Sequence, residues 1–371
     1  MKILLLGEYS NVHATLAAGL RQLGHEVVVA SNGDFWKNYP RDIDLKRAPG
    51  YWGGIKLELK VLSCLPHWRG FDVVQLINPI FLELKAERLF NIYRYLRRHN
   101  GSMFLGAYGM DYYWVHENIT RKPLRYSDFN FGDKLREDHV AMVERRDWMG
   151  TAKEQLNRMI AEDCDGIIAG LYEYWACYQP LFPDKTIFIP FPIRPNNGPM
   201  VGETVHQPLR IFIGISRNRS AYKGTDVMLA AAQAVKRAYP DKVELLVVEG
   251  VPFNEYIRQM HNSDVILDQL YSYTPAMNAL EAMNQGIVVV GGGEPENYAI
   301  LNEKELRPIV NVLPSYDSVY QQLSLLALHP ERVTELKRQG RVYINRHHDY
   351  IKVARQYETL YLQHLKKKNG E

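Results

Sequence analysis

The chain has few cysteines and no long apolar run. Its 371 residues include only three cysteines, Cys64, Cys164 and Cys177, and their spacing fits neither a zinc site nor paired disulfides. The apolar start, residues 1–6, is shorter than the apolar core of a signal peptide. No window approaches the roughly 20 apolar residues of a membrane-spanning helix. We therefore expect a cytoplasmic protein with free thiols.

An excess of charge of one sign is also missing. The formal net charge is +3, which argues against a nucleic-acid-binding scaffold, so no nucleic acid is expected as a partner. Two basic clusters stand out, Arg94/Arg97/Arg98 and Lys366–Lys368. We interpret them as solvated faces and keep weak peripheral contact with the inner face of a membrane as the alternative.

The length of the chain and the order of its apolar segments predict two domains. In the first half, strands at 2–6, 25–30, 71–77, 102–108 and 166–169 alternate with helices, the first of which is capped by Ser10 or Asn11. A proline-rich linker at 194–199 precedes a second series with strands at 209–214, 243–248, 265–267, 287–290 and 308–312. Alternation of this kind predicts parallel sheets covered by helices. We expect an α/β protein of two doubly wound, Rossmann-like domains, 1–192 and 193–346, that face each other across a cleft.

The stretch between Asp111 and Met149 is polar, aromatic and irregular. It is too long for an ordinary connection, and it follows a predicted strand of the first domain. An insertion at the carboxyl end of a strand is where a loop that shapes a substrate site would lie. The alternative is a covering flap that contacts no ligand.

Features that bind anions follow the strands of the second half. Arg217 and Lys223 lie in a basic loop between its first strand and the next helix. Thr274 is placed to cap another helix, with Pro275 at the first helical position. Gly291-Gly-Gly293 follows a strand and allows either close approach of a ligand or a tight turn. Two cations, a helix N-terminus and a glycine turn at the carboxyl ends of parallel strands favour a phosphate-bearing ligand, and a sugar nucleotide is the leading candidate.

Three segments of the second half resemble motifs of a known family. Ser216-Arg217 to Lys223-Gly224 resembles the Gly-Arg…Lys-Gly donor-phosphate motif of the GT-B-fold group 1 (family 4-like) glycosyltransferases, of the bacterial surface and capsular polysaccharide type. Residues 279–286, Ala-Leu-Glu-Ala-Met-Asn-Gln-Gly, resemble the second half of the family's Glu-x7-Glu motif. Residues 291–296, Gly-Gly-Gly-Glu-Pro-Glu, resemble its glycine-rich turn. The resemblance extends over nearly the whole chain.

The resemblance implies a retaining, metal-independent transfer of a sugar from a nucleotide-diphospho-sugar donor to a glycan or lipid-linked acceptor, in the synthesis of cell-surface polysaccharide. It implies that Arg217 and Lys223 hold the diphosphate, that Glu281 holds the ribose, and that a last helix, 347–371, crosses back to the first domain. Fixed cations would lower the barrier because negative charge grows on the departing diphosphate. The donor is a substrate, so no cofactor is expected.

Metal binding is not expected either. Asp42/Asp44 and Asp163/Asp165 match an Asp-x-Asp pattern that holds a metal and a sugar nucleotide in another glycosyltransferase fold. Neither pair lies at the carboxyl end of a predicted strand, where such a complex would bind.

The chain departs from the family's pattern at several positions. The first Glu of the Glu-x7-Glu motif falls at Tyr273, so the donor-sugar contact that it normally makes is missing or replaced. The Gly-Gly of the first loop is only Gly7-Glu8. The donor sugar and the anomeric outcome therefore stay open. Tyr273, Thr274, Gly291 and Gly292 are kept as donor-binding candidates beside Glu281.

Candidates on the acceptor side end strands of the first domain. They are Gly7-Glu8-Tyr9, Tyr108 and Asp111. Asp111 could accept a proton from the acceptor hydroxyl or hydrogen-bond the sugar, and the alternative is an aspartate that stabilises a turn. In an inverting version of the fold, His13 would be the base and Asp111 its orienting carboxylate. The alternative for His13 is a capping or packed imidazole.

Two other functions fit the same residues. One is a sugar-nucleotide epimerase on the same fold. The other is a non-catalytic relative that binds a nucleotide sugar, which the missing first Glu would permit.

Overall fold

Two units, each with its own parallel sheet, make up the part of the chain that the computed structural model describes, residues 1–196, 198, 205–216 and 220–369. Unit 1 comprises Met1–Pro123, Val143–Pro192 and Tyr350–Glu371, and unit 2 comprises Leu124–Met142 and Ile193–Asp349. The last helix therefore belongs with the first unit. Residues 124–142, in the middle of the expected insertion, pack with the second unit, whereas the sequence placed them in the first domain.

The sheet of unit 1 has, among the described residues, seven strands in the order β3-β2-β1-β4-β5-β8-β9. Every neighbouring pair is parallel. The strands are β1 (Lys2–Leu6), β2 (Glu26–Ser31), β3 (Ile43–Asp44), β4 (Val73–Leu76), β5 (Ser102–Ala107), β8 (Gly166–Ala169) and β9 (Thr186–Phe188). The strand order reverses between β1 and β4, and ligands of doubly wound sheets bind at the carboxyl ends of strands at such a point.

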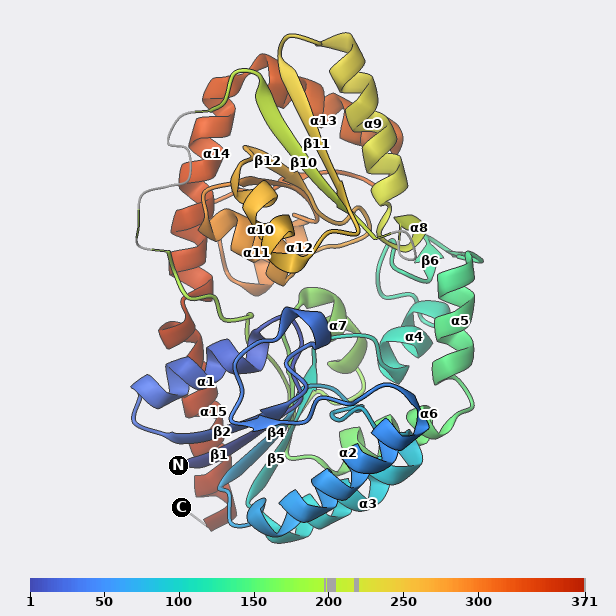
Figure 1. The fold of residues 1–371 in the computed structure, drawn as a ribbon, viewed down its shortest axis with the longest axis vertical. Helices are drawn as coiled ribbons and strands as arrows, with labels where there is room; N and C mark the ends of the chain where they lie inside the picture. Colours follow the sequence, from blue (N-terminus) through green and yellow to red (C-terminus); the bar gives the residue numbers. More distant parts are fainter. Residues whose placement is uncertain (197, 199–204, 217–219, 370–371) are drawn as a thin grey trace. The chain divides into compact units, whose positions relative to one another are not determined.

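Helices cover the sheet of unit 1, as Figure 1 shows. They are α1 (Val12–Gln22), α2 (Gly50–Cys64), α3 (Ala86–His99), α4 (Tyr112–Ile119), α6 (Ala152–Asp163), α7 (Tyr172–Tyr178) and α15 (Tyr350–Asn369), with the short 3-10 turns η1 (Phe35–Lys37) and η2 (Leu65–His67). Helix α5 (His139–Trp148) runs from unit 2 into unit 1. Helix α15 packs along α1, and α3 packs along α6.

The sheet of unit 2 has, within the described ranges, five parallel strands in the order β11-β10-β12-β13-β14. They are β10 (Leu209–Ile215), β11 (Val243–Glu249), β12 (Val265–Leu267), β13 (Val288–Gly291) and β14 (Val310–Asn311). The helices are α8 (Ser220–Lys223), α9 (Thr225–Ala238), α10 (Phe253–His261), α11 (Met277–Asn284), α12 (Pro295–Ile300), α13 (Tyr316–Leu328) and α14 (Pro330–Tyr343), with a π-helical turn η4 (Ile344–His348). A small antiparallel hairpin, β6 (Asn130–Phe131) and β7 (Lys134–Leu135), completes the unit. Here the strand order reverses between β10 and β12.

The predicted fold class is confirmed, since both halves form doubly wound parallel sheets. Some local predictions are wrong. Thr274 does not cap a helix, because α11 begins at Met277 with Ala276 as its N-cap residue. The stretch at 111–149 is not irregular, because it contains α4, the hairpin and α5. Helix α2 was not predicted.

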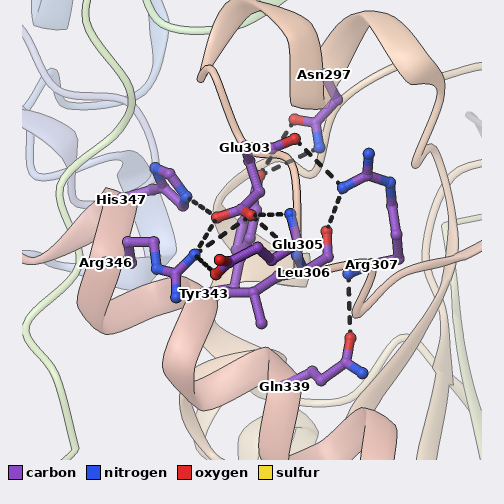
Figure 2. A network of polar contacts seen from close by, with 9 residues as sticks. All are labelled: Asn297, Glu303, Glu305, Leu306, Arg307, Gln339, Tyr343, Arg346 and His347. Carbon is purple, nitrogen blue, oxygen red and sulfur yellow. Dashed lines mark hydrogen bonds and ion pairs between the residues drawn. The ribbon is translucent and has the colours of Figure 1, made fainter.

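A buried carboxylate, Glu303, holds η4, the last turn of unit 2, by hydrogen bonds to its side chains. Figure 2 shows these contacts. Its side chain is 1% exposed and accepts hydrogen bonds from His347 Nε2 (2.6 Å), Arg346 Nη1 (3.0 Å) and the backbone N–H of Leu306 (2.9 Å). Burial alone would raise the pKa of Glu303, but these hydrogen bonds prevail and lower it to about 2. These bonds tie the π-helical turn η4 (Ile344–His348) to the loop after α12.

Candidate functional site

A pocket of about 180 Å³ lies in unit 1 where the strand order reverses. Gly7, Glu8 and Tyr9, which follow β1, line one side of it. The rest of its lining comes from the end of β2, from the loops after β2, β3 and β4, from η1 and from α2, and it is mostly apolar. Its apolar members include Phe35, Leu45, Leu57, Ile77, Phe81 and Leu82. The structure thus brings three of the acceptor-side candidates to one apolar pocket. A wider hollow of about 570 Å³ over α6 carries none of the predicted residues.

Glu8 lies in the wall of this pocket and also caps a helix. Its carboxylate accepts hydrogen bonds from the backbone N–H groups of His13 (3.2 Å) and Ala14 (2.8 Å) in the first turn of α1. These bonds take the place of the Ser10 or Asn11 cap that the sequence predicted. Burial raises the pKa of Glu8 to about 8, and the two backbone bonds oppose that shift only in part.

His13 is packed in the interior of unit 1. Its ring is fully buried, Nδ1 donates to the carbonyl oxygen of Gly7 (2.8 Å), and Nε2 lies 3.1 Å from the Gln75 amide nitrogen. Burial lowers the pKa of His13 to about 3. An imidazole that is buried and neutral, with both nitrogens hydrogen-bonded, has a structural role and is not available as a base.

Tyr108 belongs to the same buried network. Its hydroxyl lies 2.6 Å from that of Tyr357 on α15 and accepts a hydrogen bond from Gln75 (3.2 Å). Tyr361, also on α15, donates to the Gln75 side chain. Burial raises the pKa of Tyr108 well above its ordinary value. Tyr108 therefore joins the last helix to the sheet of unit 1, in a place where an acceptor could not reach it.

Asp111 caps helix α4. Its fully buried carboxylate accepts from the backbone N–H of Trp114 (2.8 Å) and from the hydroxyl of Tyr178 (2.7 Å). Burial raises the pKa of Asp111 to about 7, against the effect of these bonds. The structure does not join it to His13, whose side-chain bonds go to Gly7 and Gln75. The expected pair of base and orienting carboxylate is therefore not assembled.

The carboxyl ends of β10 and β12 carry the polar cluster of unit 2. Lys223 directly precedes Gly224, the N-cap residue of α9, and Asp268 directly follows β12. Asp268 accepts a hydrogen bond from Asn278 of α11 (2.9 Å), whose own amide oxygen accepts from Tyr256 (3.1 Å). Burial raises the pKa of Asp268, and the neighbouring Lys223 ammonium offsets part of that rise. Arg217 lies outside the described residues.

Segment 124–142 contacts two elements next to this cluster. One is α8, where Tyr222 donates to Asp128 (2.6 Å) and Arg136 donates to the carbonyl oxygen of Ala221 (2.8 Å). The other is the loop before α11. There the Tyr273 hydroxyl accepts from the backbone N–H of Arg125 (2.7 Å). The insertion therefore borders the cluster around Lys223.

The two carboxylates of the glycine-rich motif hold the same segment. Glu294, 4% exposed, accepts from Arg125 Nη2 (2.6 Å) and from the hydroxyl of Tyr126 (2.6 Å). Glu296 pairs with the same guanidinium, and the Tyr126 ring packs on the Tyr273 ring with centroids 4.7 Å apart. Tyr273, at the position of the family's first Glu, is thus a docking point for segment 124–142.

Glu281 and the glycines after β13 have internal partners as well. Glu281 accepts from the side-chain amide of Gln285 (2.8 Å), the C-cap residue of α11. A Cβ on Gly292 would lie 2.2 Å from the carbonyl oxygen of Ser272, and one on Gly291 would lie 3.1 Å from that of Gln269. Close approach of the backbone of the 268–273 loop thus accounts for glycine at 292. Thr274 is 3% exposed, and its carbonyl oxygen accepts from Ser272 (2.6 Å).

Several residues that build the two regions were not among the predicted site residues. Asp268 and Asn278 were passed over, although a polar residue directly after a buried parallel strand is a usable signal. Arg125, Tyr126 and Glu294 could not be paired from sequence, because about 170 positions separate Arg125 from Glu294.

The Asp-x-Asp pairs are engaged in ion pairs. Asp42 lies 2.6 Å from Arg21, Asp44 lies 2.8 Å from Arg41, and Arg97 contacts both Asp163 (3.2 Å) and Asp165 (2.5 Å). In the described part of the chain, no group of three or more His, Cys, Asp or Glu side chains is placed to hold a metal ion. Nor is any helix of the described residues both long and apolar enough to cross a membrane.

Comparisons with known proteins place the fold. No protein-family model matches the chain, and no curated protein sequence matches it. Among solved structures, it is similar to sucrose-phosphate synthase from Thermosynechococcus elongatus, with a TM-score of 0.59 and 15% identity over 98% of this chain and 99% of the other. It is also similar to Anabaena HepE in complex with UDP-glucose (TM-score 0.56, 13% identity, 97% and 99% covered). A third is the UDP-GlcNAc 2-epimerase from Neisseria meningitidis bound to UDP-GlcNAc (0.54, 10%, 98% and 100%). The chain therefore has a GT-B-like fold.

Proposed function

We propose that this chain is a glycosyltransferase that moves a sugar from a nucleotide-diphospho-sugar to a glycan or lipid-linked acceptor in cell-surface polysaccharide synthesis, without a metal ion. The observation that carries the proposal is the cluster at the carboxyl ends of β10 and β12. It combines the Lys223 ammonium with the N-terminus of α9 at the point where the strand order of unit 2 reverses. Anionic phosphates bind at such positions in doubly wound sheets.

The charge at this cluster suits a departing diphosphate. The ammonium of Lys223 and the amide dipoles of a 14-residue helix both offer positive potential, which a diphosphate needs more as its bond to the sugar breaks. Arg217, six residues before Lys223, would add a guanidinium suited to two phosphate oxygens. The neighbours bound to UDP-glucose and UDP-GlcNAc share the fold and support a nucleotide sugar as the ligand.

The acceptor side is assigned to the pocket of unit 1. Its lining is apolar except at a few points, which suits an acceptor with an apolar portion better than a bare sugar. Because the pKa of Glu8 is raised to about 8, its carboxyl group is protonated at neutral pH and can donate a hydrogen bond to an oxygen atom of the acceptor substrate. Tyr9 lines the same pocket. We retain Glu8 and Tyr9 as acceptor-binding residues.

A ligand-binding assay with matched variants tests the donor site. Thermal stabilisation is measured with UDP, UDP-glucose, UDP-GlcNAc and a GDP-sugar, because a ligand of the folded protein raises its melting temperature by mass action. Lys223→Ala should weaken nucleotide binding roughly 10- to 150-fold, since a charge-assisted hydrogen bond contributes about 1.5–3 kcal/mol. Arg237→Ala, an exposed cation at the other end of α9, is the control and should bind as the wild type does. Equal binding by both variants would remove Lys223 from the site.

Analysis of the reaction products distinguishes a transferase from an epimerase, the activity named for the similar structure from Neisseria meningitidis. Tyr273 in place of a glutamate favours keeping this alternative, because the donor-sugar contact of the transferase family is altered. The wild type is incubated with a UDP-sugar alone. Isomerised UDP-sugar formed without an acceptor would establish the epimerase. Binding without transfer or isomerisation across the donor panel would establish a non-catalytic relative.

A further inference from the structure

A buried carboxylate lies beside the groups that we assign to the diphosphate. Asp268 directly follows β12 and is 8% exposed. The backbone N–H of Leu270, in the loop that Asp268 begins, donates to the carbonyl oxygen of Lys223 (2.9 Å). A Cβ on Gly224, the N-cap residue of α9, would lie 2.6 Å from the Cβ of Leu270. The loop therefore packs directly against Lys223 and the start of α9.

Asp268 has few hydrogen-bond donors for a buried carboxylate. An ionised carboxylate can accept about four hydrogen bonds. Within the described residues, the donor to Asp268 is the side-chain amide of Asn278 (2.9 Å), which Tyr256 in turn fixes. Glu303 is also buried, but it accepts from two basic side chains and two backbone N–H groups. Hydrogen bonds therefore compensate the charge of Glu303 well and that of Asp268 poorly.

The charge that compensates Asp268 comes from Lys223. Burial raises the pKa of Asp268, and the Lys223 ammonium and the Asn278 hydrogen bond offset part of that rise. Helix α10 presents Tyr256 to this region, and Tyr256 stays neutral because burial raises its pKa. Strand β13 presents Gly291, which has no side chain. Within the described ranges, Lys223 is therefore the charged group that favours the ionised form of Asp268.

A diphosphate bound at Lys223 would change this balance. It would bring two negative charges to the same ammonium and to the start of α9. Like charges at close range in a buried site disfavour the ionised form of a carboxyl group. Protonation of Asp268 relieves this repulsion, because the neutral carboxyl can still accept from Asn278 and can also donate a hydrogen bond.

We propose that Asp268 couples the binding of a nucleotide-diphospho-sugar at Lys223 to the uptake of one proton. The inference deepens the proposed function, on which it rests for the position of the diphosphate. The proton comes from solvent and converts the carboxylate to the neutral carboxyl, and no bond of the ligand changes. A neutral Asp268 does not oppose the negative charge that grows on the departing diphosphate. Donor binding therefore weakens as the pH rises, and Asp268 sets this dependence.

Isothermal titration calorimetry of the full chain tests the coupling. UDP-glucose and UDP-GlcNAc are the probes, because both phosphates of a UDP-sugar are esterified and neither titrates between about pH 6 and 8. The heat of binding, measured in buffers with different heats of ionisation, gives the number of protons taken up. The wild type should take up roughly 0.3–1 proton per bound ligand at neutral pH, and its Kd should rise about two- to tenfold per pH unit.

Two variants remove the carboxyl group. Asp268→Asn keeps the shape of the side chain and still accepts from Asn278, but it has no group that takes up a proton. Its proton uptake should fall to about zero, and its Kd should change less than about twofold between pH 6 and 8. Asp268→Ser, which is smaller and also uncharged, should behave in the same way and replaces Asp268→Asn if melting curves show that variant to be poorly folded.

Asp226→Asn is the matched control. It makes the same charge change in the first turn of α9, where Asp226 is exposed. This variant should keep the proton uptake and the pH dependence of the wild type, because solvent screens an exposed charge. An equal loss of uptake in Asp226→Asn would assign the coupling to the general field of the site and overturn the role of Asp268.

The remaining outcomes separate this proposal from the proposed function. If the wild type binds a UDP-sugar without proton uptake, or if Asp268→Asn takes up as many protons as the wild type, the donor site stands and the role of Asp268 is overturned. If the wild type binds neither the UDP-sugars nor a GDP-sugar at any pH, the donor site itself is removed, and the role of Asp268 with it.

Discussion

Replacement of Glu303 by glutamine should destabilise unit 2 measurably. Glutamine keeps the shape and can still accept from the backbone N–H groups of Glu305 and Leu306, but it removes the charge that faces Arg346 and His347 (Figure 2). The gap between the ordinary pKa of 4.5 and about 2 corresponds to about 3 kcal/mol of preference for the charged form, at about 1.4 kcal/mol per pH unit. Because Arg346 is 41% exposed and therefore screened, we expect a loss of about 1–3 kcal/mol.

The assay is urea unfolding at neutral pH, followed by hydrogen exchange of amides in η4 and in the loop after α12, since two units need not unfold together. Glu305→Gln is the matched control. Glu305 pairs with the same guanidinium at 3.0 Å but is 75% exposed, so its loss should cost less than about 0.5 kcal/mol.

The pH dependence gives a second measure of the same pair. A carboxyl whose folded pKa is depressed stabilises the fold above its unfolded pKa and loses that contribution as the pH falls. The difference between wild type and Glu303→Gln should therefore be full above pH 4.5 and shrink toward pH 2. Equal effects of the two substitutions, or a difference that does not change with pH, would refute the assignment of a buried, charged Glu303.

Two further predictions concern residues that the sequence placed in the site. Gly292→Ala should lower the stability of the ligand-free protein by about 1–3 kcal/mol, because its methyl group would lie 2.2 Å from a backbone oxygen, whereas Gly291→Ala, at 3.1 Å, should cost less. Melting curves measured without nucleotide check both variants. If Gly292→Ala melts as the wild type does, packing does not explain the glycine and a ligand-binding role returns. For Glu8, the folded pKa of about 8 lies above the unfolded value, so the folded state keeps a proton that the unfolded chain loses, and stability falls as the pH rises from 4.5 to 8. The stability of wild type relative to Glu8→Gln should decline across that window in thermal melts, and a flat difference would mean that the backbone N–H groups hold Glu8 ionised.

The sheets could be predicted from sequence because their strands are short apolar runs. β1, β4, β5 and β8 are almost entirely buried, and this pattern needs no knowledge of tertiary contacts. The predicted strand at 265–267 agrees with β12 at both ends. Helix α2 was missed because its sequence begins with three glycines within five residues and is apolar on two faces, so the usual single stripe is absent.

The candidate site was less predictable because its polar groups satisfy one another across long sequence separations. His13 has the residue type and position of a base, yet Gln75, 62 positions away, occupies its Nε2. Asp111 has a plausible position at the end of β5, yet Tyr178 and the first turn of α4 use its carboxylate. Residue type and strand ends locate a site, but only tertiary contacts decide which members have spare hydrogen-bonding capacity.

The departure at Tyr273 and the insertion at 124–142 are best explained together. A glutamate at position 273 would face Glu294, already one of two carboxylates that hold Arg125, and would lack the ring that packs on Tyr126. Tyrosine instead offers a hydroxyl that accepts from the backbone N–H of Arg125 and a ring over which the Arg125 guanidinium lies at 5.0 Å. The change from carboxylate to phenol therefore converts a position that contacts the donor sugar in the resembled family into an anchor for the insertion. Under the proposed function, we therefore expect segment 124–142 and the Asp268–Asn278 pair, in place of Tyr273, to contact the donor sugar.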